Sequence, residues 1–132
     1  MKRSEIREKT FIILFQHDFN NEFTENIDHY LEREGLKNSA AEYAKHTIFG
    51  VIENLPYIDN IISKYLINWN INRINKVDIS VLRLAIYEIL LNDEIPDKVA
   101  INEAIELVKK YNGNTAGVFV NGLLDKVYKN EK

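Results

Sequence analysis

The chain has 132 residues, of which 45% are hydrophobic and 28% charged, and this balance predicts one globular domain spanning residues 1–132. It contains no cysteine, which excludes a disulfide scaffold, thiolate-bound zinc, an iron–sulfur cluster and cysteine catalysis. Because the formal net charge is −3, any binding of nucleic acid has to come from a local basic cluster.

The spacing of apolar residues predicts seven helices, at residues 4–19, 24–35, 39–55, 58–69, 79–91, 98–111 and 115–129. Ser4, Thr24 and Ser39 can cap the first three helices, and Ser39 begins a capping box that Glu42 completes. Gly35 is expected to end the second helix. These elements predict an all-α fold.

The fifth helix, residues 79–91, is apolar at nearly every position, so we expect it to be the central, most buried element. Residues 67–72 instead alternate between apolar and polar, which is typical of a strand. A lone short strand has no partner, so we interpret this segment as the end of the fourth helix, with Trp69 on its apolar face, followed by a loop.

No constellation of residues predicts an active site. His17, His29 and His46 form no pair at helical spacing, and we expect them to be surface or half-buried helix residues. The sequence has no phosphate-binding glycine loop and no nucleophile elbow. We therefore expect no catalytic residue, no metal site, no cofactor and no enzymatic activity.

Positive charge gathers at the two ends of the chain. The first ten residues hold four basic side chains, and Arg3 and Arg7 lie four positions apart, so both can project from one helix face. Lys126, Lys129 and Lys132 make the other end basic. Such clusters are more often solvated surface than a phosphate site, and both interpretations remain open.

A single-stranded nucleic acid also needs aromatic rings on which its bases can stack. The candidates are Tyr65, Phe119 and Tyr128, each of which could instead be a core aromatic at helical spacing, and Phe119 is the strongest case for the core. The longest apolar run covers only residues 11–15, which is too short to cross a membrane. We therefore expect a cytoplasmic protein with no membrane contact.

Three segments resemble the NusB antitermination family, namely residues 78–88 (DISVLRLAIYE), 96–109 (PDKVAINEAIELVK) and 118–125 (VFVNGLLD). The start of the chain, from Arg3 and Arg7 to Leu14-Phe15-Gln16, resembles the arginine-rich first helix of the same family. The resemblance covers essentially the whole chain in the right order.

The resemblance implies seven helices in two packed three-helix groups. It also implies a non-enzymatic factor that pairs with NusE, a small-subunit ribosomal protein, and binds the single-stranded boxA element of nascent RNA. Such a pair helps RNA polymerase to read through terminators within an antitermination complex, notably on ribosomal RNA operons. Some relatives form homodimers that hide the RNA surface.

Site residues follow from the same resemblance, position by position. The positions that match the RNA site of the family are Lys2, Arg3, Arg7, Tyr65, Phe119 and Asn121. Phe15 and Asp78 match positions that meet NusE, as an apolar anchor and as an acid for a basic partner. Glu5 departs from the family pattern and subtracts a charge beside the basic residues.

Two alternatives remain beside this interpretation. The chain could be a helical protein-interaction adaptor that touches no RNA. It could also be an accessory RNA-binding domain like the one at the front of some ribosomal RNA cytosine methyltransferases.

Overall fold

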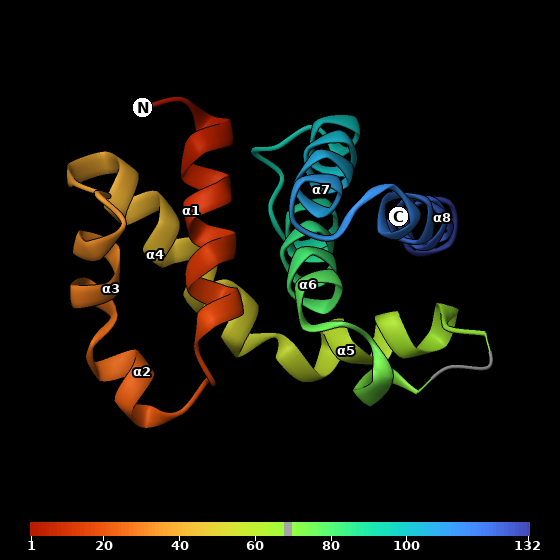
Figure 1. Cartoon of the computed structure of the whole chain (residues 1–132), viewed down its shortest axis with the longest axis horizontal. Helices are drawn as coiled ribbons and strands as arrows, with labels where there is room; N and C mark the ends of the chain where they lie inside the picture. The colour runs from red at the N-terminus through yellow and green to blue at the C-terminus, as the bar shows by residue number, and fades with distance from the viewer. Residues whose placement is uncertain (68–69) are drawn as a thin grey trace. The chain divides into compact units, whose positions relative to one another are not determined.

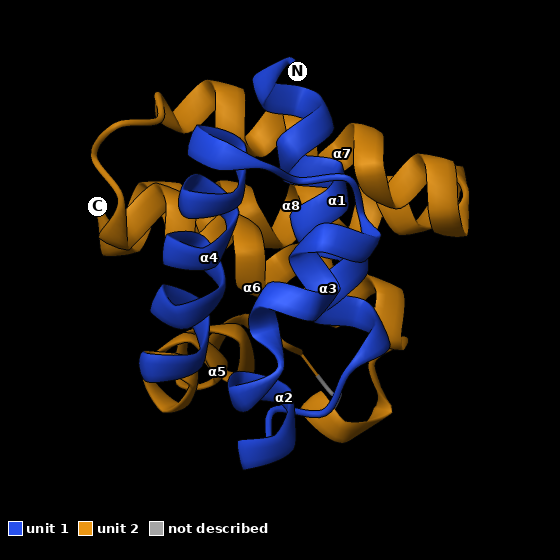
Figure 2. Ribbon diagram, turned by 90° about the vertical axis from the view of Figure 1, so that its left-hand side faces the viewer, with its two compact units in different colours: residues 1–53 blue, residues 54–132 orange. Residues whose placement is uncertain are grey.

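The computed structural model describes residues 1–67 and 70–132, and within them it contains eight α-helices, one 3₁₀ helix and no strand. The helices belong to two compact units, unit 1 from Met1 to Glu53 and unit 2 from Asn54 to Lys132 (Figure 2). The predicted all-α fold is confirmed, and the alternating segment at residues 67–72 forms no strand in its described part.

Unit 1 consists of α1 (Arg3–Gln16), α2 (Asn21–Glu25), α3 (Ile27–Arg33) and α4 (Asn38–Glu53), as Figure 1 shows. Helix α4 packs against both α1 and α3. The core side chains of α1 include Phe11 and Leu14, which are almost fully buried, as is Ile48 of α4. Burial of each such side chain contributes about 1.5–3 kcal/mol to the stability of the fold.

The predicted second helix, residues 24–35, is wrong in its start and its continuity. The side chain of Asn20, not Thr24, caps α2 by accepting a hydrogen bond from the Phe23 main-chain N–H at 2.9 Å. The chain then breaks at Asn26, which separates α2 from α3. Asparagine side chains compete for main-chain groups and so interrupt helices, which explains two short helices in place of one.

The predicted end of that helix is confirmed. Gly35 has a φ of 75°, a left-handed conformation that suits glycine. The main-chain N–H of Gly35 donates to the Glu32 oxygen at 2.9 Å, and that of Leu36 donates to the Leu31 oxygen at 3.0 Å. This pair of bonds is a Schellman motif, completed by the buried side chains of Leu31 and Leu36.

The boundaries of the next two helices also differ from expectation. Helix α4 begins at Asn38, so Ser39 lies inside the helix and not at its cap. It ends at Glu53, and Leu55 opens α5 (Leu55–Tyr65), with Pro56 in the first turn, where a missing N–H costs nothing. The predicted position of Trp69 on this helix lies outside the described residues.

Unit 2 is built around α6 (Lys76–Leu91), which contacts α5, α7 (Asp97–Asn112) and α8 (Asn114–Glu131). A 3₁₀ turn, η1 (Ile71–Arg73), precedes it. Helix α6 is buried from Asp78 to Leu82 and again from Leu84 to Ile89, which confirms its central place. Gly113, with a φ of 87°, separates α7 from α8, as the sequence predicts.

Candidate functional site

The basic residues at the start of α1 are not equally available. Lys2 and Arg3 are exposed, and the Arg3 guanidinium lies 4.6 Å from the centre of the Tyr43 ring on α4. This cation–π contact holds Arg3 against the unit while leaving it exposed to solvent.

Arg7 is buried, unlike Arg3. The expectation that both side chains are exposed on one face of the helix is therefore wrong. The Arg7 residue is only 5% exposed, although it lies one helical turn from Arg3. A guanidinium is buried in a protein only when it is paired, because the loss of its hydration is costly. An RNA contact by Arg7 would require the side chain to leave this position.

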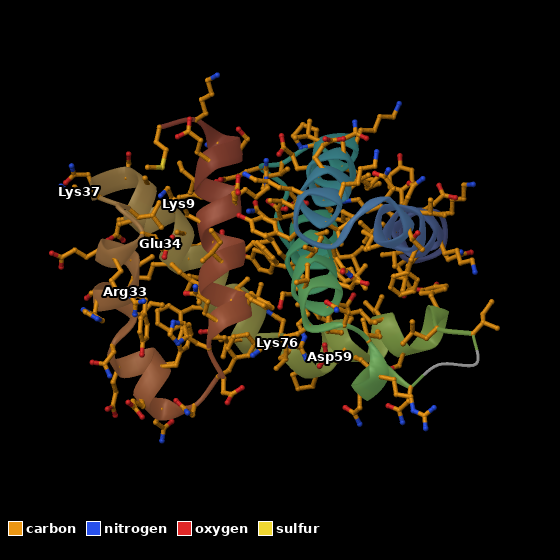
Figure 3. All side chains as sticks on the ribbon, in the orientation of Figure 1. Lys9, Arg33, Glu34, Lys37, Asp59 and Lys76 are labelled. Carbon is orange, nitrogen blue, oxygen red and sulfur yellow. The ribbon has the colours of Figure 1, made fainter. Side chains whose placement is uncertain are left out.

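Lys9, the fourth basic residue of this segment, is also engaged. Its ammonium Nζ donates to the main-chain oxygen of Glu34 at 2.6 Å (Figure 3). Glu34 is the C-cap residue of α3, where the main-chain oxygens carry partial negative charge. Lys9 therefore fastens α1 to the end of α3 within unit 1, and Lys2 and Arg3 are left as the available cations of this segment.

The positive charge available at the C-terminal end of the chain is reduced in the same way. The Lys129 ammonium pairs with the Asp125 carboxylate at 3.0 Å, and that of Lys132 lies 3.4 Å from the Asp97 carboxylate. The Lys132 ammonium also donates to the Ile89 main-chain oxygen at 2.9 Å. Lys126 is exposed, and no residue in the described part of the chain forms an ion pair with it. Lys126 is therefore the available cation of α8.

Tyr65 and Phe119, far apart in the sequence, line one pocket of about 260 Å³. We call it the α5–α8 pocket, and its lining residues are Tyr65, Leu66, Ile67, Val118, Phe119, Gly122, Leu123 and Lys126. Both rings are half-buried, so neither belongs to the closed core. Unit 2 thus places two aromatic rings and one cation at the same hollow.

The orientation of Tyr65 is held by the end of α8. The Tyr65 hydroxyl donates a hydrogen bond to Glu131 Oε2, and the Lys64 ammonium donates to the same oxygen at 2.8 Å. The hydrogen bonds from Lys64 and then Tyr65 lower the pKa of Glu131 below its ordinary value. The bond to Glu131 raises the pKa values of Lys64 and Tyr65. The carboxylate therefore stays ionised and fixes both neighbours.

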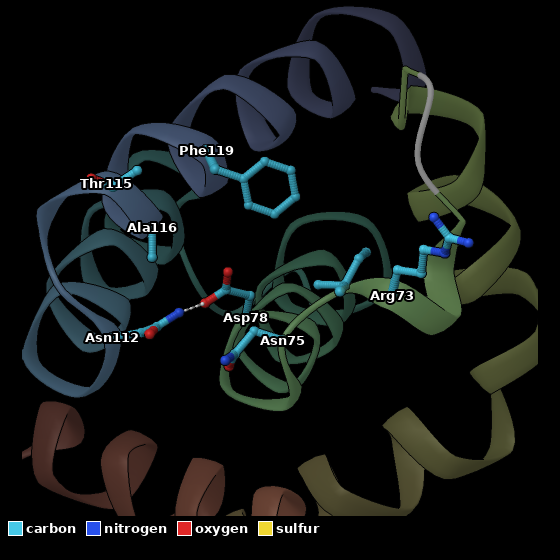
Figure 4. Close-up of a pocket in the computed structure, with 8 residues that line it drawn as sticks. Arg73, Asn75, Asp78, Asn112, Thr115, Ala116 and Phe119 are labelled. Atoms are coloured by element: carbon cyan, nitrogen blue, oxygen red, sulfur yellow. Dashed lines mark hydrogen bonds between the residues drawn. The ribbon is translucent and has the colours of Figure 1, made fainter.

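Phe119 also lines a second, larger hollow of about 490 Å³ (Figure 4). We call it the Asp78 pocket, and besides Phe119 its lining includes Arg73, Asn75, Asp78, Asn112 and Thr115. The Asn112 side-chain amide donates to Asp78 Oδ1 at 2.8 Å, and Asp78 is 8% exposed. Asp78 is therefore no open surface acid, because a group has to enter the pocket to reach it.

The two remaining site residues lie elsewhere. Asn121 is exposed on α8 but lines neither pocket, because two positions along a helix turn the side chain about 200° away from Phe119. Phe15 is half-buried in unit 1, with its ring centre 6.0 Å from that of Phe11. The structure thus brings Tyr65 and Phe119 together, and it does not bring Asn121 into either hollow with them.

Sequence reasoning missed Val118, Gly122 and Glu131 as residues of this region, and it noted Lys126 only as part of the basic C-terminal end. Val118, Gly122 and Lys126 are spaced four positions apart and so share one face of α8, a signal that the sequence contains. Glu131 could not be found in this way, because its contact with Tyr65 joins residues 66 positions apart.

The three histidines take no part in these hollows. His29 and His46 are exposed, and His17 is half-buried with its ring centre 3.9 Å from that of Tyr30. The expectation of surface or half-buried helix residues is confirmed for His29 and His46, whereas half-buried His17 lies just beyond the end of α1. Within residues 1–67 and 70–132, no three metal-ligating side chains come together, and no helix is long and apolar enough to cross a membrane.

Comparison with known proteins gives consistent results. The model of the NusB family matches residues 4–129. Transcription antitermination protein NusB of Ruminiclostridium cellulolyticum is 46% identical over 132 residues, which cover 99% of this chain and 91% of that protein.

Two solved structures are similar over nearly the whole chain. NusB from T. maritima has a TM-score of 0.86 and 42% identity, and the match covers 98% of this chain and 92% of that one. A complex described as antitermination factors NusB and NusE with double-stranded RNA contains a chain with a TM-score of 0.85 and 32% identity, covering 96% of both chains.

Proposed function

This chain belongs to the NusB family of transcription antitermination proteins, and we propose that it binds single-stranded boxA RNA together with NusE. The family consists of antitermination factors and not enzymes, in agreement with the sequence. The observation that carries the RNA proposal is the α5–α8 pocket, where Tyr65 and Phe119 lie beside the exposed cation of Lys126. Aromatic rings next to a cation are what unpaired bases and their phosphates require.

The available positive charge favours a shared site over an independent one. Lys2, Arg3 and Lys126 are the cations that we expect to contact phosphates. Each phosphate neutralised on a single strand contributes a slope of about −0.7 to a plot of log affinity against log salt, so about three contacts give a slope near −2. This electrostatic contribution to RNA affinity is modest. A basic partner would enlarge the positively charged surface that contacts the RNA. Asn121 would contact the strand beyond the pocket.

For NusE, we propose that Phe15 and Asp78 keep the roles implied by the family. Phe15 offers a half-buried apolar ring, and the Asp78 pocket would receive a basic side chain of the partner. The solved complex of a similar chain with NusE and RNA supports NusE as the partner. Neither contact requires the Lys126 side of α8.

The same proposal includes the cellular location, the larger complex and the oligomeric state that the family implies. We infer that the chain acts in the cytoplasm within an RNA polymerase antitermination complex on ribosomal RNA operons. We also infer that units 1 and 2 function as one domain, since the family model spans both. A homodimer, as in some relatives, would compete with RNA binding.

The test is fluorescence anisotropy with labelled single-stranded boxA RNA, a scrambled strand and a boxA duplex, each with and without NusE. We expect tighter binding of the boxA strand than of the other two, strengthened by NusE. Equal affinity for all three RNAs would contradict recognition of single-stranded boxA, and no RNA binding while NusE still binds would favour the adaptor alternative.

A further inference from the structure

Tyr43 on α4 contacts Arg3 at the start of α1, and we propose that Tyr43 is a positioning residue for RNA binding. Its ring holds the Arg3 guanidinium in the orientation from which that group meets a phosphate of the strand, while Tyr43 itself does not touch the RNA. The inference rests on the proposed function, because it concerns how one cation of the RNA site is held.

The first turn of α1 lacks the contact that most often fixes the start of a helix. Lys2 occupies the N-cap position, and its side chain makes no capping hydrogen bond because an ammonium has no acceptor atom. Lys2 and Arg3 also lie at the positive end of the helix dipole, where cations are unfavourable. A contact from outside the helix can hold this turn instead, and the guanidinium carbon of Arg3 lies 4.6 Å from the centre of the Tyr43 ring.

This ring contact leaves the hydrogen-bonding groups of Arg3 free for a ligand. Arg3 is exposed, and among the described residues its guanidinium forms no ion pair and no hydrogen bond. In a cation–π contact the face of the ring attracts the guanidinium, which spends none of its N–H donors on an acceptor. Lys9 differs, since its ammonium already donates to the Glu34 main-chain oxygen at 2.6 Å. Arg3 is thus held in place and still able to bind a phosphate with two parallel N–H groups.

The hydroxyl of Tyr43 takes no part in this arrangement. It is buried, and no described residue forms a hydrogen bond with it. A buried hydroxyl without a partner lowers stability, and a cation–π contact does not need it, because phenylalanine makes the same contact. The ring alone should therefore carry the effect of Tyr43 on RNA binding.

The experiment is a double-mutant cycle with Arg3→Ala, Tyr43→Leu and the two combined in the full-length chain, with NusE present. Anisotropy with labelled single-stranded boxA RNA gives the affinity. We expect Tyr43→Leu to weaken RNA binding about two- to fivefold, the range that corresponds to an exposed cation–π contact. The salt slope should become shallower by about 0.7, because one phosphate contact is lost. In the Arg3→Ala background the same substitution should have no further effect.

Two variants serve as controls. Tyr43→Phe keeps the ring and should retain wild-type RNA affinity, with an equal or higher Tm because the unpaired hydroxyl is gone. Tyr57→Leu removes a tyrosine of α5 that is 47% exposed and lines neither the α5–α8 pocket nor the Asp78 pocket, so it should leave RNA affinity unchanged. Pull-down of NusE should give the same result for every variant.

A further measurement needs no RNA. The main-chain N–H of Ile6 donates to the Lys2 oxygen at 3.1 Å, a hydrogen bond within the first turn of α1. Hydrogen exchange at the Ile6 amide should be faster in Tyr43→Leu than in the wild type, because the turn opens more often once the ring is gone. Exchange in Tyr43→Phe should equal that of the wild type.

Four results would overturn the inference. Wild-type RNA affinity in Tyr43→Leu would show that the ring is not needed. An equal loss with and without Arg3 would show that Tyr43 acts independently of this cation. Loss of affinity in Tyr43→Phe would assign the effect to the hydroxyl, and unchanged exchange at Ile6 in Tyr43→Leu would show that the ring does not hold the turn. Failure of the proposed function is distinguishable, because the wild-type chain would then bind no RNA even with NusE.

Discussion

The Tyr65 hydroxyl and the Glu131 carboxylate, 66 positions apart in the sequence, are joined by a hydrogen bond between the end of α5 and the end of α8. The Lys64 ammonium donates to the same carboxylate oxygen at 2.8 Å. One acid at the end of the last helix thus orients an aromatic ring of the α5–α8 pocket.

Replacing Glu131 with alanine should release both neighbours. We expect Glu131→Ala to weaken RNA binding because Tyr65 is no longer held at the pocket, while NusE binding is unchanged. Glu131→Gln is the conservative control, since its amide oxygen can still accept the Tyr65 hydrogen bond. Anisotropy with boxA RNA distinguishes the two, and equal losses in both variants would show that charge and not orientation matters.

The same contact predicts a dependence of stability on pH. The pKa of Glu131 is lowered in the folded chain, so the stabilisation is present above the ordinary value of 4.5 and is lost as the pH falls through the folded pKa. The pKa of Lys64 is raised, so its contribution is present below its ordinary value of 10.5 and is lost as the pH rises through the folded pKa. Calorimetry should therefore show that the Tm difference between wild type and Glu131→Ala is largest near neutral pH.

Arg3 and Arg7 should respond oppositely to the same substitution. Arg7→Ala removes a buried side chain and should lower the free energy of unfolding by about 1–3 kcal/mol, because the buried polar groups that it contacts lose their partner. Arg3→Ala loses an exposed cation–π contact worth about 0.5–1 kcal/mol and should mainly weaken RNA binding. Denaturant unfolding and anisotropy measured on both variants check this, and a stable Arg7→Ala variant would contradict the burial argument.

Phe119 and Phe15 should affect RNA binding and NusE binding to different degrees. Phe119→Ala removes a stacking surface and should cost about 1–3 kcal/mol of RNA binding energy. Phe15→Ala should weaken NusE binding and leave the affinity of the chain alone for RNA unchanged. Asn121→Ala lies outside both pockets and should cost less RNA affinity than Phe119→Ala. Loss of RNA affinity by the Phe15→Ala chain alone would contradict separate surfaces, whereas Phe119→Ala can also affect NusE binding because Phe119 lines the Asp78 pocket as well.

Asp78 gives a second test of the partner surface. Asp78→Asn keeps the size of the side chain but removes the charge that we propose for a basic group of NusE. NusE binding, measured by calorimetric titration, should weaken and should lose part of its salt dependence. Asn112→Ala is the companion variant, because it removes the hydrogen bond to Asp78 without changing the charge.

The sequence predicts the helices of unit 2 well, because long periodic segments with clear ends at Gly113 and Pro96 leave little ambiguity. It fails between residues 20 and 34, where asparagine side chains cap and interrupt helices that the apolar spacing would join. Helical spacing also marks Phe119 as a core aromatic, although the structure leaves it half-buried between two hollows.

The site is less predictable for a physical reason. The hydropathy of arginine predicts an exposed Arg7. The side chain is buried instead, because of tertiary packing that no local sequence pattern encodes. The same holds for Lys9 and Lys132, whose ammonium groups donate to distant main-chain oxygens, whereas the pair of Lys129 with Asp125 lies four positions apart on one helix. Counting basic residues therefore overestimates the charge that is available to RNA.

Cross-linking tests the central claim most directly. Single-stranded boxA RNA is irradiated with the chain in the presence of NusE, and the adducts are located by mass spectrometry. The account predicts adducts on Tyr65 or Phe119, lost when either ring is replaced by alanine. Adducts confined to the acidic segment at residues 18–34, with none in residues 65–67 or 118–126, would contradict it.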